Sequence, residues 1–473
     1  MLADWRRIGR AAVGTRPADY AALAGAVRGL IRDGRLGLAV RLPAERVLAE
    51  QLDVSRTTVS AAYRLLREQG YLDSRRGSGS FTALPEGQHM STTGLWSPDD
   101  ESVLDLGCAA PAAPAELTAA AQRARSRLPH YATGPGYHPA GLPELRAAVA
   151  DLFTRRGAPT GPAEILVTSG AQQAFDLLVR LLVAPGERVL VESPGYPNAL
   201  AALGHARARV ETVGVGPDGW ELSALLPSLA AGRYRLTYLT PDFQNPSGQL
   251  MCAADRERLA VTARGGKTTV VVDETFVDLS LDDDPLPPPM AAVDRRRRVV
   301  TIGGMSKSYW GGLRVGWLRA SPALVQRLAA VRSTVDMGGA VLDQLIALHL
   351  LADRDRILPV RRAQLLAQRD ALAAELRRQL PDWRFDLPRG GLSLWVELDS
   401  PVSSAVAAAA ELHGVRLAPG PRFGAEGTLE RFLRMPFALS PDALVEAVRR
   451  IAAARSHLDV APPGRPASPV VVA

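Results

Sequence analysis

The chain has 473 residues, of which 47% are hydrophobic and 22% are charged. That length exceeds a typical single domain, and the composition excludes a disordered or fibrous protein. The net charge of +7 is concentrated at one end, because residues 1–82 contain 14 arginines, no lysine and eight acidic residues. A basic module ahead of a nearly neutral body favours nucleic-acid binding, although a solvated basic face would give the same count.

Cys108 and Cys252 are the only cysteines of the sequence, and their separation matches no metal-binding or redox motif. Such scarcity is typical of a reducing compartment, so we expect a cytoplasmic protein. The N-terminal segment lacks the apolar core of a signal peptide. No run of about 18 apolar residues occurs, so no membrane span is expected.

Residues 1–83 are predicted to form a winged helix-turn-helix. Residues 20–31 place apolar side chains on one helical face, Pro43 can open a second helix, and Ser55 can cap a third. Two short extended runs around Gly77 then predict a β-hairpin. Three helices followed by a hairpin are the elements of this DNA-binding fold.

The second helix of a helix-turn-helix enters the major groove of DNA, and its first turn contacts the bases. Here that turn contains an arginine, which can donate two hydrogen bonds to guanine or bind phosphate, and two threonines. An arginine of the preceding helix can meet the DNA backbone, and at the hairpin tip, which holds Arg75, Arg76 and Gly77, the glycine lets the chain approach the minor groove. The residues expected to contact double-stranded promoter DNA are therefore Arg46, Arg56, Thr57, Thr58, Arg76 and Gly77.

The segment from Leu42 to Phe81, LPAERVLAEQLDVSRTTVSAAYRLLREQGYL followed by RRGSGSF, resembles the winged helix of the GntR family. By that resemblance the same six positions contact DNA. Ser60 departs from the pattern, because many relatives have a base-contacting arginine there. A helix-turn-helix used only for protein contacts is the alternative.

Residues 84–103 are rich in Pro, Gly, Ser, Thr and acidic residues, as in a linker. Beyond them, short buried-strand patterns alternate with helical segments, which is typical of a mainly parallel α/β sheet. The strands are predicted at 164–168, 188–192, 235–239, 268–273 and 298–303. A long helical stretch is expected over 323–380, a small α+β lobe over about 385–455 and a disordered tail over 456–473.

Each predicted strand is followed by polar residues or glycines, and open α/β sheets bind ligands at that edge. Lys307 follows the last strand, Asp273 ends the fourth, and Asn245 and Tyr196 follow the third and the second. After the first strand, Gly170, Ala171 and Gln172 begin a helix whose N–H groups can bind phosphate. Together these segments offer what pyridoxal phosphate requires: an amine, an anion for the pyridine nitrogen, a phenolate donor, a stacking ring and a phosphate cradle.

The segments SGAQQA, ESPGYPN, NPSG, VVDE and SK(x)6R occur in this order, and residues 104–455 resemble the fold-type-I aminotransferases. The resemblance implies that Lys307 forms the Schiff base with the cofactor, that Asp273 pairs with the pyridine nitrogen, that Asn245 binds the phenolate oxygen and that Tyr196 stacks on the ring. It implies that Arg434 binds an effector carboxylate. The residues that it assigns to phosphate are Gly170, Ala171, Gln172, Ser306, Arg314 and, from the neighbouring subunit, Tyr137.

Two positions depart from the enzymes. Phe276 replaces a tyrosine that donates to the phenolate oxygen, and Gly304 replaces a serine or threonine that contacts the phosphate. Both changes fit a sensor better than a fast enzyme.

The whole arrangement resembles the MocR subfamily of bacterial regulators. It implies a homodimer that binds promoter DNA and senses pyridoxal phosphate, an amine or an amino acid at Lys307. The alternatives are a pyridoxal-phosphate-dependent aminotransferase with an autoregulatory DNA-binding domain, and a GntR regulator whose body binds an unrelated effector.

Overall fold

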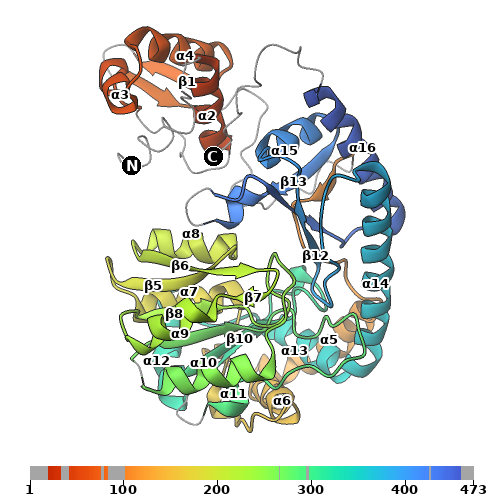
Figure 1. Cartoon of the computed structure of the whole chain (residues 1–473). Coiled ribbons are helices and arrows are strands. Elements are labelled where there is room, and N and C mark those ends of the chain that lie inside the picture. Colours follow the sequence, from red (N-terminus) through yellow and green to blue (C-terminus); the bar gives the residue numbers. More distant parts are fainter. Residues whose placement is uncertain are drawn as a thin grey trace.

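The computed structural model contains an N-terminal helical domain, a large lobe built on an eight-stranded sheet and a small lobe built on a four-stranded sheet (Figure 1). None of the helices that it describes is long and apolar enough to cross a membrane. The residues described are 20–32, 42–75, 79–83, 102–265, 267–294, 298–424 and 428–459.

Among its described residues, the N-terminal domain has three helices followed by a hairpin, as the sequence predicts. Their bounds are α2 (Tyr20–Arg32), α3 (Glu45–Leu52), α4 (Arg56–Glu68), β1 (Leu72–Arg75) and β2 (Gly79–Thr82). Leu48, Val59 and Leu66 are fully buried between them and form the core. Ser55 caps α4 by accepting a hydrogen bond of 3.0 Å from the Thr58 N–H, as predicted.

The predicted start of the second helix was wrong by two residues. The helix α3 begins at Glu45 with Ala44 as its N-cap, so Pro43 precedes the helix. The Pro43 carbonyl accepts a hydrogen bond of 2.9 Å from the Tyr63 hydroxyl of α4. Pro43 therefore helps to hold α3 against α4.

All five predicted strands of the large lobe are present, and the prediction of a mainly parallel sheet is confirmed. The strand order is β4-β11-β10-β9-β8-β5-β6-β7, in which β11 and β7 are antiparallel to their neighbours. The bounds are β4 (Ile165–Thr168), β5 (Arg188–Ser193), β6 (Arg209–Gly216), β7 (Gly219–Trp220), β8 (Leu236–Leu239), β9 (Thr269–Asp273), β10 (Val299–Gly304) and β11 (Gly316–Arg319).

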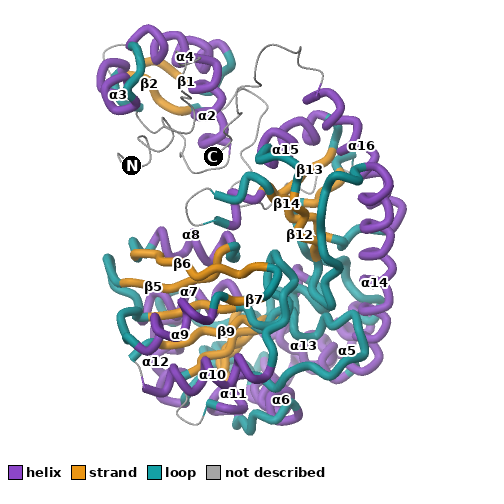
Figure 2. Tube along the Cα trace, in the orientation of Figure 1, coloured by secondary structure: helices purple, strands orange, loops and turns teal. Residues whose placement is uncertain are grey.

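Helices cover both faces of this sheet (Figure 2), because its buried strands are apolar on both sides. One face packs against α7 (Ala171–Leu182), α8 (Pro197–His205) and α12 (Pro322–Arg332). The other face packs against two groups of helices. Their bounds are α5 (Leu117–Tyr131), α6 (Pro143–Arg155), α9 (Leu222–Ala230), α10 (Ala253–Gly265), α11 (Met290–Val293) and α13 (Val341–Ala352).

The long helical stretch predicted over 323–380 is divided into α12, α13 and α14 (Arg354–Gln379). The chain leaves the helical conformation after α12, where Met337 and Gly338 have positive φ values of 58° and 138°. Apolar periodicity does not reveal such a break, because each helix keeps its own buried face.

The small lobe extends beyond the predicted range of about 385–455. Its sheet has the order β12-β14-β13-β3, and its first strand comes from the start of the body. The bounds are β3 (Leu104–Leu106), β12 (Ser393–Glu397), β13 (Val415–Pro419) and β14 (Phe432–Pro436). The helices α15 (Ser403–Leu412) and α16 (Pro441–Asp459) pack on this sheet. Because α16 continues to Asp459, residues 456–459 are helical and do not belong to the disordered tail predicted over 456–473.

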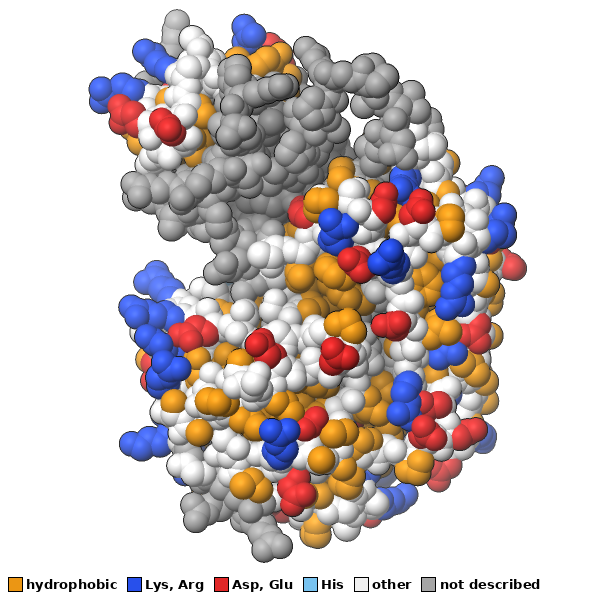
Figure 3. All heavy atoms as spheres, in the orientation of Figure 1, with side chains coloured by type: hydrophobic (Ala, Val, Ile, Leu, Met, Phe, Trp, Pro, Cys, Tyr) orange, Lys and Arg blue, Asp and Glu red, His pale blue; other side chains and the backbone are white. Residues whose placement is uncertain are grey.

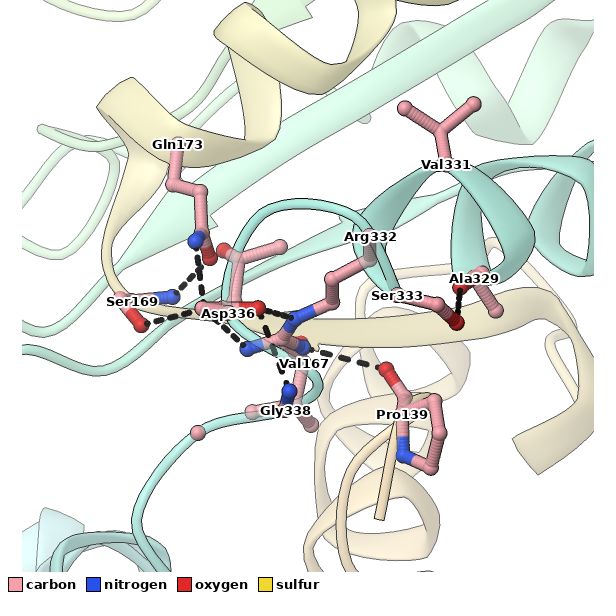
Figure 4. Close-up of polar contacts among 12 residues, drawn as sticks. Pro139, Val167, Ser169, Gln173, Ala329, Val331, Arg332, Ser333, Asp336 and Gly338 are labelled. Carbon is pink, nitrogen blue, oxygen red and sulfur yellow. Dashed lines mark hydrogen bonds and ion pairs between the residues drawn. The ribbon is translucent and has the colours of Figure 1, made fainter. Parts of the chain in front are cut away.

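An ion pair between the buried Arg332 and the more exposed Asp336 holds the turn after α12 in place (Figure 4). The fully buried Arg332 donates from Nε and Nη2 to the two carboxylate oxygens of Asp336, at 2.7 and 3.1 Å. Its Nη1 donates to the carbonyl oxygens of Pro139 and Val167. A single guanidinium thus ties the end of α12 to β4 and to the loop before α6.

Asp336 extends this network to the start of α7. It accepts hydrogen bonds from Gln173 Nε2 at 2.6 Å and from the Gly338 N–H at 3.2 Å (Figure 4). Burial raises the pKa of Asp336, but the hydrogen bonds from Arg332 and Gln173 outweigh this effect and hold the pKa below its ordinary value.

We predict that Asp336→Asn lowers the free energy of unfolding by about 3 kcal/mol at pH 7, because Arg332 would remain buried without a counter-ion. Urea unfolding measures this value. The effect should shrink as the pH falls below about 4, because the unfolded chain then binds a proton that the native carboxylate, with its lowered pKa, binds only at a still lower pH. Asp151→Asn breaks the exposed pair with Arg155 and should cost less than about 1 kcal/mol. Equal losses in the two variants would contradict the role given to Asp336.

Candidate functional site

The first turn of α4 presents the polar side chains that the sequence assigns to DNA. Arg56 and Thr57 are exposed, and Thr58 is half-buried. Arg46 projects from α3 into solvent, and its contact with Glu50 is loose at 3.9 Å. The first N–H groups of a helix have no acceptor within it, so this turn adds backbone donors to the side chains. Arg76 and Gly77 lie outside the described residues.

In the large lobe, the three parallel neighbours β8, β9 and β10 end at one edge of the sheet. The loops that carry Asn245, Asp273 and Lys307 therefore meet there. The antiparallel strand β11 starts at the same edge, where Gly316 pairs with both Gly304 and Thr168. This pairing brings Arg314 beside the start of α7.

Lys307 is partly buried, and its Nζ donates a hydrogen bond of 2.7 Å to the Ala109 carbonyl oxygen. Burial lowers the pKa of its amine to about 8; the positive charge of Arg434 adds to the shift, and the negative charge of Asp273 opposes it. A substantial fraction of the amine is therefore neutral near pH 7 to 8, which is the form that reacts with carbonyl compounds.

Asp273 is a buried carboxylate at the end of β9. It accepts hydrogen bonds from the Tyr238 hydroxyl at 2.6 Å and from the Thr275 N–H at 2.8 Å, and the Thr275 hydroxyl is a third donor. Burial raises the pKa of Asp273, while these hydrogen bonds and the nearby Lys307 oppose the rise. The sequence interpretation missed Tyr238 and Thr275, although the position of a tyrosine on the adjacent parallel strand could have indicated the first.

Glycines allow a close approach between β11 and the start of α7. Gly170 has a φ of +98°, and a Cβ atom there would lie 3.1 Å from Arg314 Nη2. A Cβ atom at Gly316 would lie only 2.5 Å from the Gly170 carbonyl carbon. Arg314, which is exposed, donates to the Ser169 carbonyl oxygen at 2.6 Å. A guanidinium and a helix N-terminus are thus fixed side by side.

The remaining phosphate candidates lie around this point. Ala171 and Gln172 form the first turn of α7, and Ser306 precedes Lys307 in the half-buried part of its loop. A Cβ atom at Gly304 would lie 3.5 Å from the Ala171 nitrogen. A serine or threonine at this position would therefore place a hydroxyl beside the helix N-terminus, and Gly304 removes it.

Two loops carry Tyr196 and Asn245, and the buried Glu192 joins them. Its carboxylate accepts hydrogen bonds from the Thr240 N–H at 2.8 Å and from Gln244 Nε2 at 3.2 Å. Burial raises the pKa of Glu192 to about 7, against these hydrogen bonds. Glu192 is the last residue of the second predicted strand, but no pattern there indicated this role.

Tyr196 and Asn245 both lie near Arg434. The Tyr196 hydroxyl accepts a hydrogen bond of 3.0 Å from Asn198 Nδ2. Burial raises the pKa of Tyr196, and the positive charge of Arg434 partly offsets this rise. Asn245 Oδ1 lies 3.5 Å from Arg434 Nη1. The structure therefore brings these three predicted residues to one place.

Arg434 is buried on β14 of the small lobe. Its guanidinium lies 5.0 Å from the centre of the Phe423 ring and donates to the Gly107 carbonyl oxygen. Burial lowers its pKa to about 10. Its Nε has no hydrogen-bond partner, and no carboxylate lies within 4.0 Å of the guanidinium, in the part of the chain that the structure describes. A buried cation of this kind is suited to an external anion.

Phe276 and Tyr137 stand apart from the polar site. Phe276 is buried in an apolar cluster with residues of the small lobe, so no hydroxyl comes from this position. Tyr137 is 61% exposed in the loop before α6, and the structure does not bring it to the other predicted residues.

Comparison with known proteins agrees with this architecture. Residues 104–451 match the family "Aminotransferase class I and II", and residues 19–82 match "Bacterial regulatory proteins, gntR family". The α-aminoadipate aminotransferase LysN from Thermus thermophilus has a similar solved structure, in complex with N-(5'-phosphopyridoxyl)-L-leucine. The TM-score is 0.70 at 30% identity, over 76% of this chain and 93% of that one.

Relatives in sequence include enzymes and regulators. The 2-aminoadipate transaminase of T. thermophilus is 32% identical over 69% of this chain and 82% of its own length. The probable rhizopine catabolism regulatory protein MocR of Rhizobium meliloti is 31% identical over 76% and 77%. The regulator TauR of Rhodobacter capsulatus is 28% identical over 90% and 94%. The chain therefore belongs to the class I and II aminotransferase family, as a MocR-type protein with a gntR-family helix-turn-helix domain ahead of the aminotransferase fold.

Proposed function

We propose that this protein is a transcriptional regulator that binds promoter DNA through residues 1–83 and senses pyridoxal phosphate, or a small amine or amino acid, at Lys307. The observation that carries the proposal is a partly buried amine of lowered pKa, near a buried carboxylate and a phosphate-type cradle, in a chain with a gntR-type domain ahead of this site.

The phosphate cradle fits the cofactor. Gly170 and Gly316 leave no room for side chains at the point where Arg314 meets the start of α7. A phosphate group there would be held by the Arg314 guanidinium, by the N–H groups of Ala171 and Gln172 and, after a small rotation, by the Ser306 hydroxyl. The Gly304 position offers space but no hydroxyl.

The rest of the site fits the cofactor ring. Asp273 would accept a hydrogen bond from the protonated pyridine nitrogen, and that positive charge would offset the cost of burying the carboxylate. Tyr196 would lie on the ring face, and the Asn245 amide would donate to the phenolate oxygen. When bound, pyridoxal phosphate supplies an aldehyde that combines reversibly with amines. Lys307 provides the amine that holds it.

Arg434 points to the class of effector. Its unpartnered Nε and its lack of a carboxylate partner in the described residues suit the α-carboxylate of an amino acid. Because Arg434 belongs to the small lobe and Lys307 to the large lobe, an amino acid would contact both lobes. An effector that binds one arrangement of the lobes more tightly shifts the population toward it.

A homodimer completes the proposal. A two-fold dimer would present two copies of α4 to two half-sites of an operator. The exposed Tyr137 is then available to the cofactor phosphate of the neighbouring subunit.

An aminotransferase that regulates its own gene is the second candidate, favoured by the 32% identity to a transaminase. Repeated turnover of an amino acid with a keto acid, at rates typical of enzymes, would support that candidate. The proposed regulator should instead show at most slow, incomplete exchange, because Phe276 and Gly304 remove two groups from the site.

The cofactor assignment is tested at Lys307. Purified protein incubated with pyridoxal phosphate should become visibly coloured, and borohydride should fix one cofactor to the peptide that contains Lys307. Lys307→Ala should abolish both results. Lys267→Ala is the matched control, because Lys267 is exposed and is the only other lysine of the chain. A colourless wild-type protein would refute the assignment.

The DNA-binding assignment is tested on α4. With an operator selected in vitro, Arg56→Ala should weaken binding in fluorescence anisotropy by about 5- to 150-fold, which corresponds to about 1–3 kcal/mol for a guanine contact. Arg64→Ala is the control, because Arg64 lies on the same helix, is 70% exposed and is distant from its first turn. Equal effects would mean that α4 does not bind DNA through its N-terminus.

The effector class is tested at Arg434. The variant Arg434→Lys should weaken the response to amino acids about tenfold and leave the response to amines without a carboxylate unchanged, because lysine keeps the charge but cannot donate two parallel hydrogen bonds. The change in cofactor absorbance on titration measures both responses. Equal losses for the two ligand classes would indicate that Arg434 does not bind the carboxylate.

A further inference from the structure

A buried hydrogen-bond network joins the two loops that carry Tyr196 and Asn245. Gln244, the residue before Asn245, is only 1% exposed, and its side-chain Nε2 makes two hydrogen bonds. One goes to Glu192 Oε2 at 3.2 Å and the other to the Pro194 carbonyl oxygen at 2.7 Å. Glu192 lies in β5 and Pro194 directly follows this strand. The Gln244 amide therefore connects the loop of Asn245 to the loop of Tyr196.

The rest of Gln244 holds its own loop together. Its Oε1 accepts hydrogen bonds from the Ser247 N–H at 3.0 Å and from the Ser247 hydroxyl at 2.7 Å. Its backbone N–H donates to the Gln249 carbonyl oxygen at 2.8 Å, and its carbonyl oxygen accepts from the Gly248 N–H at 2.6 Å. Because every polar atom of Gln244 is bonded, this residue and its loop are held as one unit.

Glu192 determines which way the Gln244 amide points. An ionised carboxylate can only accept hydrogen bonds, so the nitrogen of the amide must face it and the oxygen must face Ser247. The same carboxylate accepts from Trp220 Nε1 on β7 at 2.6 Å and from the Thr240 N–H after β8 at 2.8 Å. Three donors thus point at one carboxylate of a residue that is only 2% exposed. Hydrogen bonds of this kind are strongest when the acceptor is charged.

No positive charge balances this carboxylate. Glu192 has no ion-pair partner among the residues that the structure describes, and the three groups that donate to it are neutral. On β8, burial raises the pKa of Tyr238 well above its ordinary value, and the charges of Asp273 and Glu192 add to the rise, so its hydroxyl stays neutral. Glu221, the residue after Trp220, is exposed to solvent. Burial raises the pKa of Glu192 to about 7, against the hydrogen bonds that it accepts.

We propose that Glu192 and Gln244 form a clamp that positions Tyr196 and Asn245 for the cofactor and that opens when Glu192 is protonated. Both act through other residues and are therefore positioning residues. Protonation turns one carboxylate oxygen from an acceptor into a donor, so the carboxyl no longer satisfies all three donors that face it. The two loops are then less firmly joined, and pyridoxal phosphate binds more weakly below neutral pH. This inference rests on the proposed function, because it concerns the cofactor.

The role of the charge is tested with Glu192→Gln, which keeps the shape of the side chain. Cofactor absorbance of the full-length protein gives the dissociation constant of pyridoxal phosphate, which should be about tenfold higher in the variant at pH 8. At pH 6 the wild type is itself mostly protonated at Glu192, so the two constants should differ by no more than about twofold. Titration of Lys307 affects both proteins and cancels in the ratio. The same ratio at both pH values would indicate a purely structural effect and would overturn the proposal.

The role of the amide is tested with Gln244→Glu, which replaces the donor by a second carboxylate facing Glu192. The dissociation constant at pH 8 should rise by at least about tenfold, because a hydrogen bond is lost and two negative charges repel. Gln249→Glu is the matched control, because Gln249 lies in the same loop and its side chain bonds to the Pro217 carbonyl oxygen at the surface. It should leave the constant unchanged. Equal losses in the two variants, both shown to be folded by urea unfolding, would count against the clamp.

A measurement without cofactor separates the clamp from the proposed function. Because the Trp220 indole donates to Glu192, protonation of the carboxylate should change the tryptophan fluorescence of the cofactor-free protein, with a midpoint at about pH 7. This transition should be absent in Glu192→Gln and in Trp220→Phe. A wild type that lacks it would overturn the clamp even if the cofactor binds. A wild type that shows it but binds no pyridoxal phosphate would support the clamp and refute the proposed function.

Discussion

The close packing of β11 against the start of α7 is the constraint on which the rest of the candidate site depends. Any side chain at Gly316 would collide with the Gly170 backbone, and Gly170 adopts a positive φ at the same point. Only this approach brings Arg314 to the helix N-terminus, because β11 runs against its neighbours. The parallel strands then add Asp273, Asn245 and Lys307 at the same edge. The backbone geometry therefore determines which side chains meet in the candidate site.

Burial of charge is the second common theme. Lys307, Asp273 and Arg434 each have a pKa shifted by burial toward the neutral form, and each has few charged partners in the described residues. Such groups are costly in an empty site and become balanced when a ligand of opposite charge arrives. Arg332 shows the contrasting solution, in which Asp336 and backbone carbonyls satisfy the guanidinium within the protein. The first arrangement suits binding and the second suits stability.

Much of this could be predicted from the sequence, because buried parallel strands are apolar runs and their ends are marked by polar residues. The five strands and the convergence of Lys307, Asp273, Asn245 and Tyr196 follow from that pattern. The winged helix-turn-helix followed from helical periodicity and a hairpin signal, and the place of Arg434 was implied only by the resemblance to the aminotransferases. The strand β11 was missed because it is short, and it contains a glycine and an arginine. The small lobe was placed too late in the chain, since β3 pairs with a strand about 310 residues further on, and sequence periodicity holds no information on pairing partners. The partners of Asp273 arise only from packing.

The abundance of arginine has a consequence for the selectivity of the site. Lys307 and Lys267 are the only lysines of the chain, so nearly every other cation is a guanidinium that stays protonated at physiological pH. Reactive aldehydes in the cell therefore find almost no competing side-chain amine on this molecule. One aldehyde molecule can then react with one Lys307 amine per chain, and almost none of the aldehyde is consumed by amines on the protein surface.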